Sequence, residues 1–148
     1  MLTKKEATAA ILAAKKEKGL TFEQIAAAVG RHKVWVTSAL LGQSSMSAAE
    51  AEAAVKILGL GPGVAEALQE IPTKGSLDHT VPVDPLIYRF HEITQVYGTT
   101  MKALIHEMFG DGIMSAIDFE IDIKKQPDPK GDRVVITYNG KFLPYRKW

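Results

Sequence analysis

The chain has 148 residues, of which 46% are hydrophobic and 24% are charged, and it contains no cysteine. This composition fits a globular protein with a core, and it excludes disulfides, thiolate nucleophiles and cysteine-based metal sites. The formal net charge of +1 argues against a dedicated nucleic-acid binder, which usually has a clear basic excess. No apolar run reaches the roughly 20 residues that span a bilayer, and no signal-peptide core follows the start, so we expect a cytoplasmic protein.

The first half of the chain predicts a helical bundle. Three capping boxes mark helix starts at Thr3, Thr21 and Ser47, because each of these residues is followed three positions later by Glu or Gln. Glycines after the periodic segments supply the helix ends, and these are Gly19, Gly30, Gly42 and Gly59. The helices expected after the first one span about 22–29, 33–41, 48–58 and 63–69.

A linker is predicted at residues 71–83, where two prolines and a glycine interrupt any helical period. We place the domain boundary within it. The prediction is a helical bundle at 1–75 and a second domain at 76–148.

Two helices are predicted at the start of the second domain. Asp84 is a suitable N-cap, and Pro85 is a suitable first helical residue. Apolar residues then recur at helical spacing as far as Gly98, which we expect to end the first of these helices. The second should follow directly and stop at the glycine-rich segment 109–112.

A small antiparallel sheet is predicted after these helices. From Ile117 the hydrophobic period changes from 3.6 to 2, which indicates a half-buried strand. Alternation resumes at 134–138 after a polar connection at 126–131, and Asn139-Gly140 is a strong hairpin-turn signal before a short strand at 142–143. So small a sheet is not stable alone, so we expect it to pack on the two helices or on another subunit. The predicted fold class is α+β.

Residues 21–41 have the spacing of a helix-turn-helix, with Gly30 between the helices and Arg31, His32 and Lys33 where a recognition helix would begin. A DNA-binding transcriptional regulator is therefore the alternative function. The rest of that helix is mostly apolar, however, and has few side chains to read base edges or anchor phosphates. We favour a bundle that resembles a DNA-binding domain without acting as one.

Arg89, Glu92 and Ser115 are the candidate chemical groups. Arg89 and Glu92 lie three residues apart and are therefore neighbours on a helix. Arginine offers a planar fork of donors for a carboxylate-like anion, and Ser115 could add a hydroxyl donor after the turn at 110–112. Spacing alone also fits a surface ion pair and an ordinary strand-entry serine. No serine triad is indicated, and the four histidines show no zinc spacing, so no metal is expected.

Five stretches of the second domain carry a resemblance. They are Tyr88-Arg89-Phe90, Gln95-Val96-Tyr97-Gly98-Thr99-Thr100, Lys102-Ala103-Leu104, Phe109-Gly110-Asp111-Gly112-Ile113 and Ser115-Ala116-Ile117. Together they closely resemble the cyanate hydratases, and the helical first part and the tail at 140–144 are similar to that family as well. The resemblance implies that Arg89, Glu92 and Ser115 are catalytic, and that Arg89, Ser115 and Leu143 bind substrate.

For function, the resemblance implies a carbon–nitrogen lyase of cyanate detoxification and nitrogen metabolism. Bicarbonate and cyanate would give carbon dioxide and carbamate, and carbamate would decompose to ammonia and carbon dioxide. Bicarbonate is thus a co-substrate, and no metal or organic cofactor is implied. The implied assembly is an intertwined dimer, five of which form a decamer with sites between subunits. A non-catalytic anion-binding or assembly protein on the same scaffold stays open as an alternative.

Overall fold

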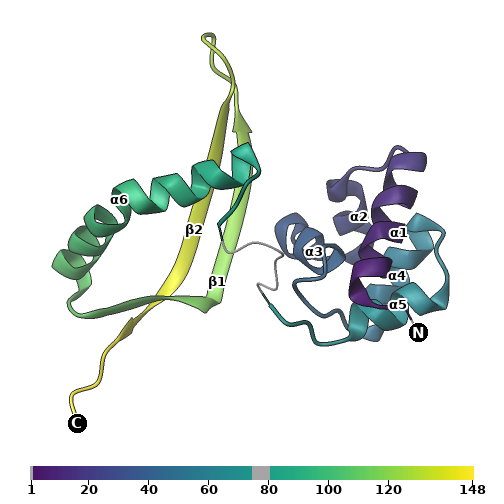
Figure 1. Cartoon of the computed structure of the whole chain (residues 1–148), viewed down its shortest axis with the longest axis horizontal. Coiled ribbons are helices and arrows are strands. Elements are labelled where there is room, and N and C mark those ends of the chain that lie inside the picture. Colours follow the sequence, from purple (N-terminus) through teal and green to yellow (C-terminus); the bar gives the residue numbers. More distant parts are fainter. Residues whose placement is uncertain (1, 75–80) are drawn as a thin grey trace. The chain divides into compact units, whose positions relative to one another are not determined.

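The computed structural model describes residues 2–74 and 81–148, and Figure 1 shows their secondary structure. The chain divides into two compact units, Met1–Ser76 and Leu77–Trp148, here called unit 1 and unit 2. The predicted boundary between residues 75 and 76 lies outside the described residues. Unit 1 contributes helices, while unit 2 combines one helix with a two-stranded antiparallel sheet, so the fold class is α+β as predicted. Over the described ranges, no helix is both long and apolar enough to cross a membrane.

Unit 1 contains the five predicted helices. In chain order they are α1 (Lys4–Glu17), α2 (Phe22–Val29), α3 (Lys33–Leu40), α4 (Ala48–Leu58) and α5 (Pro62–Gln69). The three capping boxes at Thr3, Thr21 and Ser47 are all confirmed, with both reciprocal hydrogen bonds present in each. These caps satisfy backbone N–H groups that have no partner inside the helix, and they therefore fix where α1, α2 and α4 begin.

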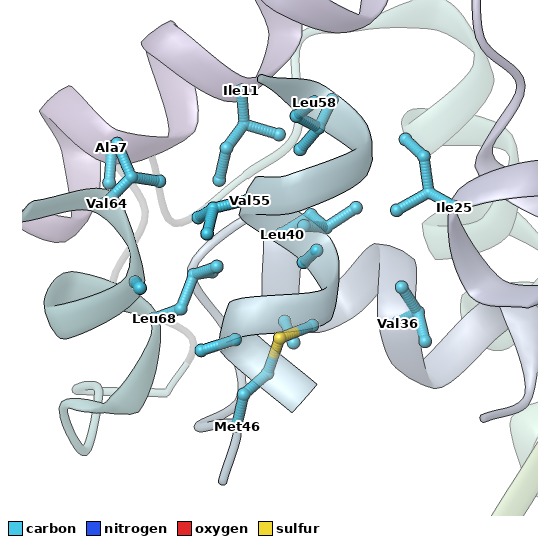
Figure 2. Close-up of a cluster of buried hydrophobic side chains, with 14 of the residues drawn as sticks. Ala7, Ile11, Ile25, Val36, Leu40, Met46, Val55, Leu58, Val64 and Leu68 are labelled. Carbon is cyan, nitrogen blue, oxygen red and sulfur yellow. The ribbon is translucent and has the colours of Figure 1, made fainter. Parts of the chain in front are cut away.

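An apolar core holds unit 1 together, and Figure 2 shows its side chains converging from several helices. The largest fully buried side chains are Ile11, Ile25, Val36, Leu40 and Leu58. Burial of a side chain of this size contributes about 1.5–3 kcal/mol. Hydrophobic burial is therefore the main source of the stability of unit 1.

Unit 2 begins with one helix, α6 (Pro85–Phe109), where two were predicted. The Asp84 carboxylate caps it by accepting from the backbone N–H groups of Leu86 at 2.9 Å and Ile87 at 3.0 Å. The predicted end at Gly98 is wrong because the apolar stripe stays in phase across it, at Leu86, Phe90, Ile93, Tyr97, Leu104 and Met108. A single glycine costs a helix only about 1 kcal/mol relative to alanine, which a continuous pattern tolerates.

The sheet of unit 2 consists of β1 (Gly112–Gln126) and β2 (Arg133–Pro144), a long ribbon in Figure 1. The strands are joined between Gln126 and Arg133, where a polar connection was predicted. The predicted hairpin turn at Asn139-Gly140 is wrong, because both residues lie within β2 and pair with β1. An Asn-Gly pair makes a hairpin only when its two flanking segments pair with each other, and here both flanks pair with β1.

Many apolar side chains of α6 and of the sheet are left uncovered by the rest of unit 2. α6 has no buried residue along its 25 positions. Leu86, Val96 and Leu104 are 65%, 59% and 54% exposed, and Ile117 of β1 is 98% exposed. A continuous exposed apolar face of this length marks an interaction surface.

Candidate active site

Arg89 and Glu92 lie one turn apart on α6 and form the predicted ion pair. Arg89 Nη1 donates to Glu92 Oε2 at 3.0 Å, and the two side chains are 61% and 47% exposed. An exposed pair of this kind contributes only about 0–1 kcal/mol to stability. Because this carboxylate is the one hydrogen-bond partner of the guanidinium among the described residues, several of its five N–H groups stay free to bind an anion.

Ser115 lies in β1 at an irregularity of the sheet. Met114 pairs with Phe142 and Phe119 pairs with Gly140, so four residues of β1 face the single Lys141 of β2. We call residues 115–118 the bulge. Extra residues of this kind bend a strand and redirect its side chains. Ser115, the first residue of the bulge, is turned inward and is only 5% exposed.

The bulge backbone fixes the Ser115 hydroxyl. Its Oγ accepts hydrogen bonds from the backbone N–H groups of Ile117 at 3.1 Å and Asp118 at 3.0 Å. Both lone pairs of the hydroxyl oxygen are therefore occupied, so the hydroxyl can interact with a further group only by donating its proton. A nucleophilic serine needs a base to take that proton, and within residues 2–74 and 81–148 no basic side chain is hydrogen-bonded to the Ser115 hydroxyl. The geometry favours a hydrogen-bond donor for an anion.

Leu143 lies beside the bulge in β2. It pairs with Ile113, two residues before Ser115 along β1, and its side chain is 40% exposed. The sheet register therefore brings Ser115 and Leu143 into one neighbourhood.

Two contacts tie this neighbourhood to the C-terminal end of α6. His106 Nε2 lies 3.1 Å from the carbonyl oxygen of Gly112. The rings of Phe109 and Phe142 are stacked with their centroids 5.1 Å apart. The position of the bulge is thereby set by the end of α6 where β1 begins.

Of the four predicted site residues, Arg89 contacts Glu92, while Ser115 and Leu143 are neighbours only through the sheet register. Within the described part of one chain, no hydrogen bond or ion pair joins Ser115 to either charged residue. Arg89 stands 17 positions before His106 on α6, which is roughly 25 Å along a helix axis. The guanidinium therefore lies far from the end of α6 that contacts the start of β1.

Two glycines of this region were not predicted as parts of the site. A Cβ atom on Gly140 would lie 2.6 Å from the carbonyl oxygen of Ser115, and one on Gly112 would overlap the carbonyl oxygen of Leu143. The signal that could have singled out Gly140 was its Asn-Gly context, but that context predicted a turn. The close approach depends on the bulge, which the sequence alone did not indicate.

The cations at the start of α3 are paired with carboxylates, which weakens the DNA-binding alternative. Arg31 Nε lies 2.6 Å from Glu50 Oε1, and Lys33 Nζ lies 3.8 Å from Glu23 Oε1. Phosphate binding depends on unneutralised cations. In the same described ranges, no group of three or more His, Cys, Asp or Glu residues could hold a metal ion.

Fold and site together define an α+β protein in which a helical unit precedes a helix-and-hairpin unit that carries an arginine–carboxylate pair and a fixed serine hydroxyl. Residues 4–72 match the family model "Cyanate hydratase, N-terminal", and residues 79–147 match "Cyanate lyase C-terminal domain". The chain therefore belongs to the cyanate hydratase family of lyases.

Individual relatives agree with the family models. The chain is 58% identical to the cyanate hydratase of Synechococcus sp. (strain CC9311), over 95% of this chain and 94% of that protein. It is 53% identical to the cyanate hydratase of Cupriavidus necator, over 99% of this chain and 100% of that protein. The crystal structure of cyanase from T. urticae is similar with a TM-score of 0.83 and 43% identity, and it covers 93% of this chain and 96% of its own.

Proposed function

We propose that this protein decomposes cyanate in a bicarbonate-dependent reaction, with Arg89, Glu92 and Ser115 as catalytic residues. Bicarbonate, cyanate and one proton give carbon dioxide and carbamate, and carbamate with a second proton gives ammonia and carbon dioxide. The observation that carries the proposal is the Ser115 hydroxyl, whose lone pairs are occupied by two backbone N–H groups. In a family named for an anionic substrate, a hydroxyl restricted to donation is suited to bind that substrate.

The chemical difficulty in this reaction is that both substrates are anions and repel each other in water. Free N–H groups of Arg89 and the proton of Ser115 would offset this repulsion and hold the two anions together. A bicarbonate oxygen then bonds to the cyanate carbon, and its bond to the bicarbonate carbon breaks to release carbon dioxide. Positioning and donors already in place supply the catalysis, and no metal or organic cofactor takes part.

Glu92 and Leu143 have supporting roles in this proposal. The Glu92 carboxylate holds one arm of the guanidinium at 3.0 Å and limits how much negative charge the pocket accepts. Leu143 binds substrate from β2 beside the bulge, where its partly exposed side chain would keep water from the anions. Exclusion of water strengthens the electrostatic contribution of every donor in the pocket.

A second copy of the chain completes the site in this proposal. Among the described residues of one chain, no hydrogen bond or ion pair joins Arg89 to Ser115, so the Arg89 of one copy would meet the Ser115 of another. The exposed apolar residues of α6 and of the sheet supply matching surfaces for such an exchange. An intertwined dimer would cover both, and the family resemblance implies a decamer of five dimers. A helical bundle without DNA-binding activity and a cytoplasmic location complete the proposal.

Ammonia release from cyanate, with and without added bicarbonate, tests the reaction. The variants are Arg89→Leu and, as a matched control, Arg133→Leu, which also removes an arginine from an arginine–carboxylate contact, with Asp128 at 3.3 Å. We expect bicarbonate-dependent ammonia release by the wild type and by Arg133→Leu. Arg89→Leu should lose at least about 100-fold in rate, since a fixed donor to developing charge contributes this much. Activity without bicarbonate, or full activity of Arg89→Leu, would contradict the mechanism.

Light scattering across a dilution series, with activity measured on the same samples, tests the assembly. Activity should disappear as the dimer dissociates. A fully active monomer would exclude the shared site.

A further inference from the structure

A backbone contact across the sheet connects Gly140 to Ser115. A Cβ atom built on Gly140 would lie 2.6 Å from the carbonyl oxygen of Ser115 and 2.5 Å from Met114 Cγ. Real Cβ atoms essentially never approach another heavy atom this closely, so any side chain at position 140 must displace something. Met114 can rotate away, but the Ser115 carbonyl is backbone and can move only with its own residue.

The need for glycine at this position is steric. The described glycines with positive φ are Gly19, Gly30, Gly42, Gly59, Gly110 and Gly131, and Gly140 is not among them. Alanine could therefore adopt the backbone conformation of residue 140 without strain. What alanine cannot do is occupy the space that the bulge fills.

We propose that Gly140 is a positioning residue that sets where the Ser115 hydroxyl points. This inference rests on the proposed function, in which Ser115 donates to substrate. Four residues of β1 face one residue of β2 here, and they can crowd against β2 only because Gly140 leaves room. The carbonyl of Ser115 lies against Gly140, and its Oγ accepts from the N–H groups of Ile117 and Asp118. Together these contacts fix the direction in which the hydroxyl proton can be donated.

The first test is the kinetics of Gly140→Ala in the assembled enzyme. We expect kcat to fall at least about tenfold while the dimer and the secondary structure persist, because a displacement of about 1 Å in a catalytic group can cost up to 100-fold. Gly61→Ala is the matched control, since Gly61 has open space around its Cβ position and no positive φ, and it should keep wild-type activity. A Gly140→Ala enzyme with wild-type kcat would overturn the inference.

A double-mutant cycle with Ser115→Ala separates positioning from a general structural effect. If Gly140 acts through Ser115, Gly140→Ala should slow the wild type but leave Ser115→Ala almost unchanged. Equal losses in both backgrounds would show that Gly140 acts elsewhere, and the inference would fail while the proposed role of Ser115 stood. Full activity of Ser115→Ala alone would instead remove the proposed role of Ser115, and the inference with it.

Met114→Ala distinguishes the two clashes and supplies a second background. It removes the contact of position 140 with Met114 and leaves the contacts with the Ser115 carbonyl and with Phe119 Cδ2, which lies 3.1 Å away. Met114→Ala/Gly140→Ala should stay as slow as Gly140→Ala, and recovery to the level of Met114→Ala would overturn the inference. If Gly140→Ala does not assemble, the same cycle with Ser115→Ala is measured in the roomier Met114→Ala background, with the same two outcomes.

Discussion

Arg89 donates to Glu92 from one turn earlier on the same helix, over 3.0 Å. Arginine preceding glutamate is the less favourable order against the helix dipole, and both side chains are substantially exposed. The pair therefore adds little to the stability of α6. The contact uses one N–H of the guanidinium and leaves most of its donors free, as the proposed binding of an anion requires.

Replacing Glu92 with Gln should separate its charge from its hydrogen bond. The amide oxygen can still accept from Arg89, but the pocket loses one negative charge. We expect nitrate, used as an unreactive competing anion, to inhibit Glu92→Gln at least about fivefold more strongly, since roughly 1 kcal/mol of repulsion is removed. Glu107→Gln on the same helix is the control and should bind nitrate like the wild type. An unchanged nitrate inhibition constant in Glu92→Gln would exclude a charge-limiting role.

Ser115→Ala should reduce both activity and stability. Loss of the donated proton should lower kcat by about 100-fold or more. The N–H groups of Ile117 and Asp118 also lose their acceptor, which should lower the free energy of unfolding by about 1–3 kcal/mol. Ser44→Ala, which removes a hydroxyl 3.3 Å from that of Ser38, is the control for kinetics and denaturation. A covalent adduct on Ser115, detected by mass spectrometry during turnover, would show a nucleophile in place of a donor.

Leu104→Glu should break the proposed dimer. Leu104 is 54% exposed on the apolar stripe of α6, and a buried unpaired carboxylate in an interface is strongly unfavourable. We expect monomers without activity, measured by light scattering and ammonia release. Leu12→Glu places the same charge at a 40% exposed leucine of α1, where the dimer and its activity should survive. An active, dimeric Leu104→Glu enzyme would mean that α6 is not the contact surface.

Lowering the pH should reduce the free energy of unfolding of unit 1, because Glu50 becomes protonated. Hydrogen bonds from the Ser47 backbone N–H and from Arg31 hold the pKa of the Glu50 carboxyl below its ordinary value of 4.5. A depressed pKa in the folded state means that the stabilisation is present above pH 4.5 and is lost as the pH falls through the folded-state pKa. Glu50→Gln should therefore be less stable than the wild type at neutral pH, by roughly 0.3–1 kcal/mol, with the difference shrinking below pH 4.5.

Fluorescence of Trp35 can follow this effect, because it is one of two tryptophans in the chain and lies in α3. Denaturation would be monitored in a Trp148→Phe background, so that only unit 1 reports. Glu52→Gln, on the same helix but outside the cap, should change stability little. A constant difference between wild type and Glu50→Gln from pH 7 to pH 3 would disagree with the linkage.

Local chemistry was enough to predict most of unit 1. A capping box satisfies backbone groups within three residues, so Thr3, Thr21 and Ser47 located helix starts without knowledge of the rest of the fold. The helix end predicted at Gly98 and the turn predicted at Asn139-Gly140 were wrong because neither depends on local chemistry alone. Whether a glycine ends a helix or an Asn-Gly pair forms a turn depends on what the flanking residues contact, and those contacts are set elsewhere in the chain.

The candidate site also combines features that local spacing predicts with features that depend on long-range pairing. The spacing of Arg89 and Glu92 predicted their contact, because three residues are nearly one helical turn. The inward turn of Ser115 was not predictable, because it depends on a mismatch between the lengths of two strands that are paired at a distance in sequence. The role of Gly140 was not predictable for the same reason, since the space that a Cβ atom would need there is filled by residues more than twenty positions earlier in the chain.

The exposed apolar surface of α6 affects how newly made chains become active enzyme. In the proposed dimer, the exposed apolar surfaces of α6 and of the sheet are covered only after two copies of the chain meet. Maturation would then depend on encounters, so activity regained after denaturation should appear with second-order kinetics, and melting temperature should climb with chain concentration. A cell that doubles its supply of this polypeptide would gain more than double the working enzyme.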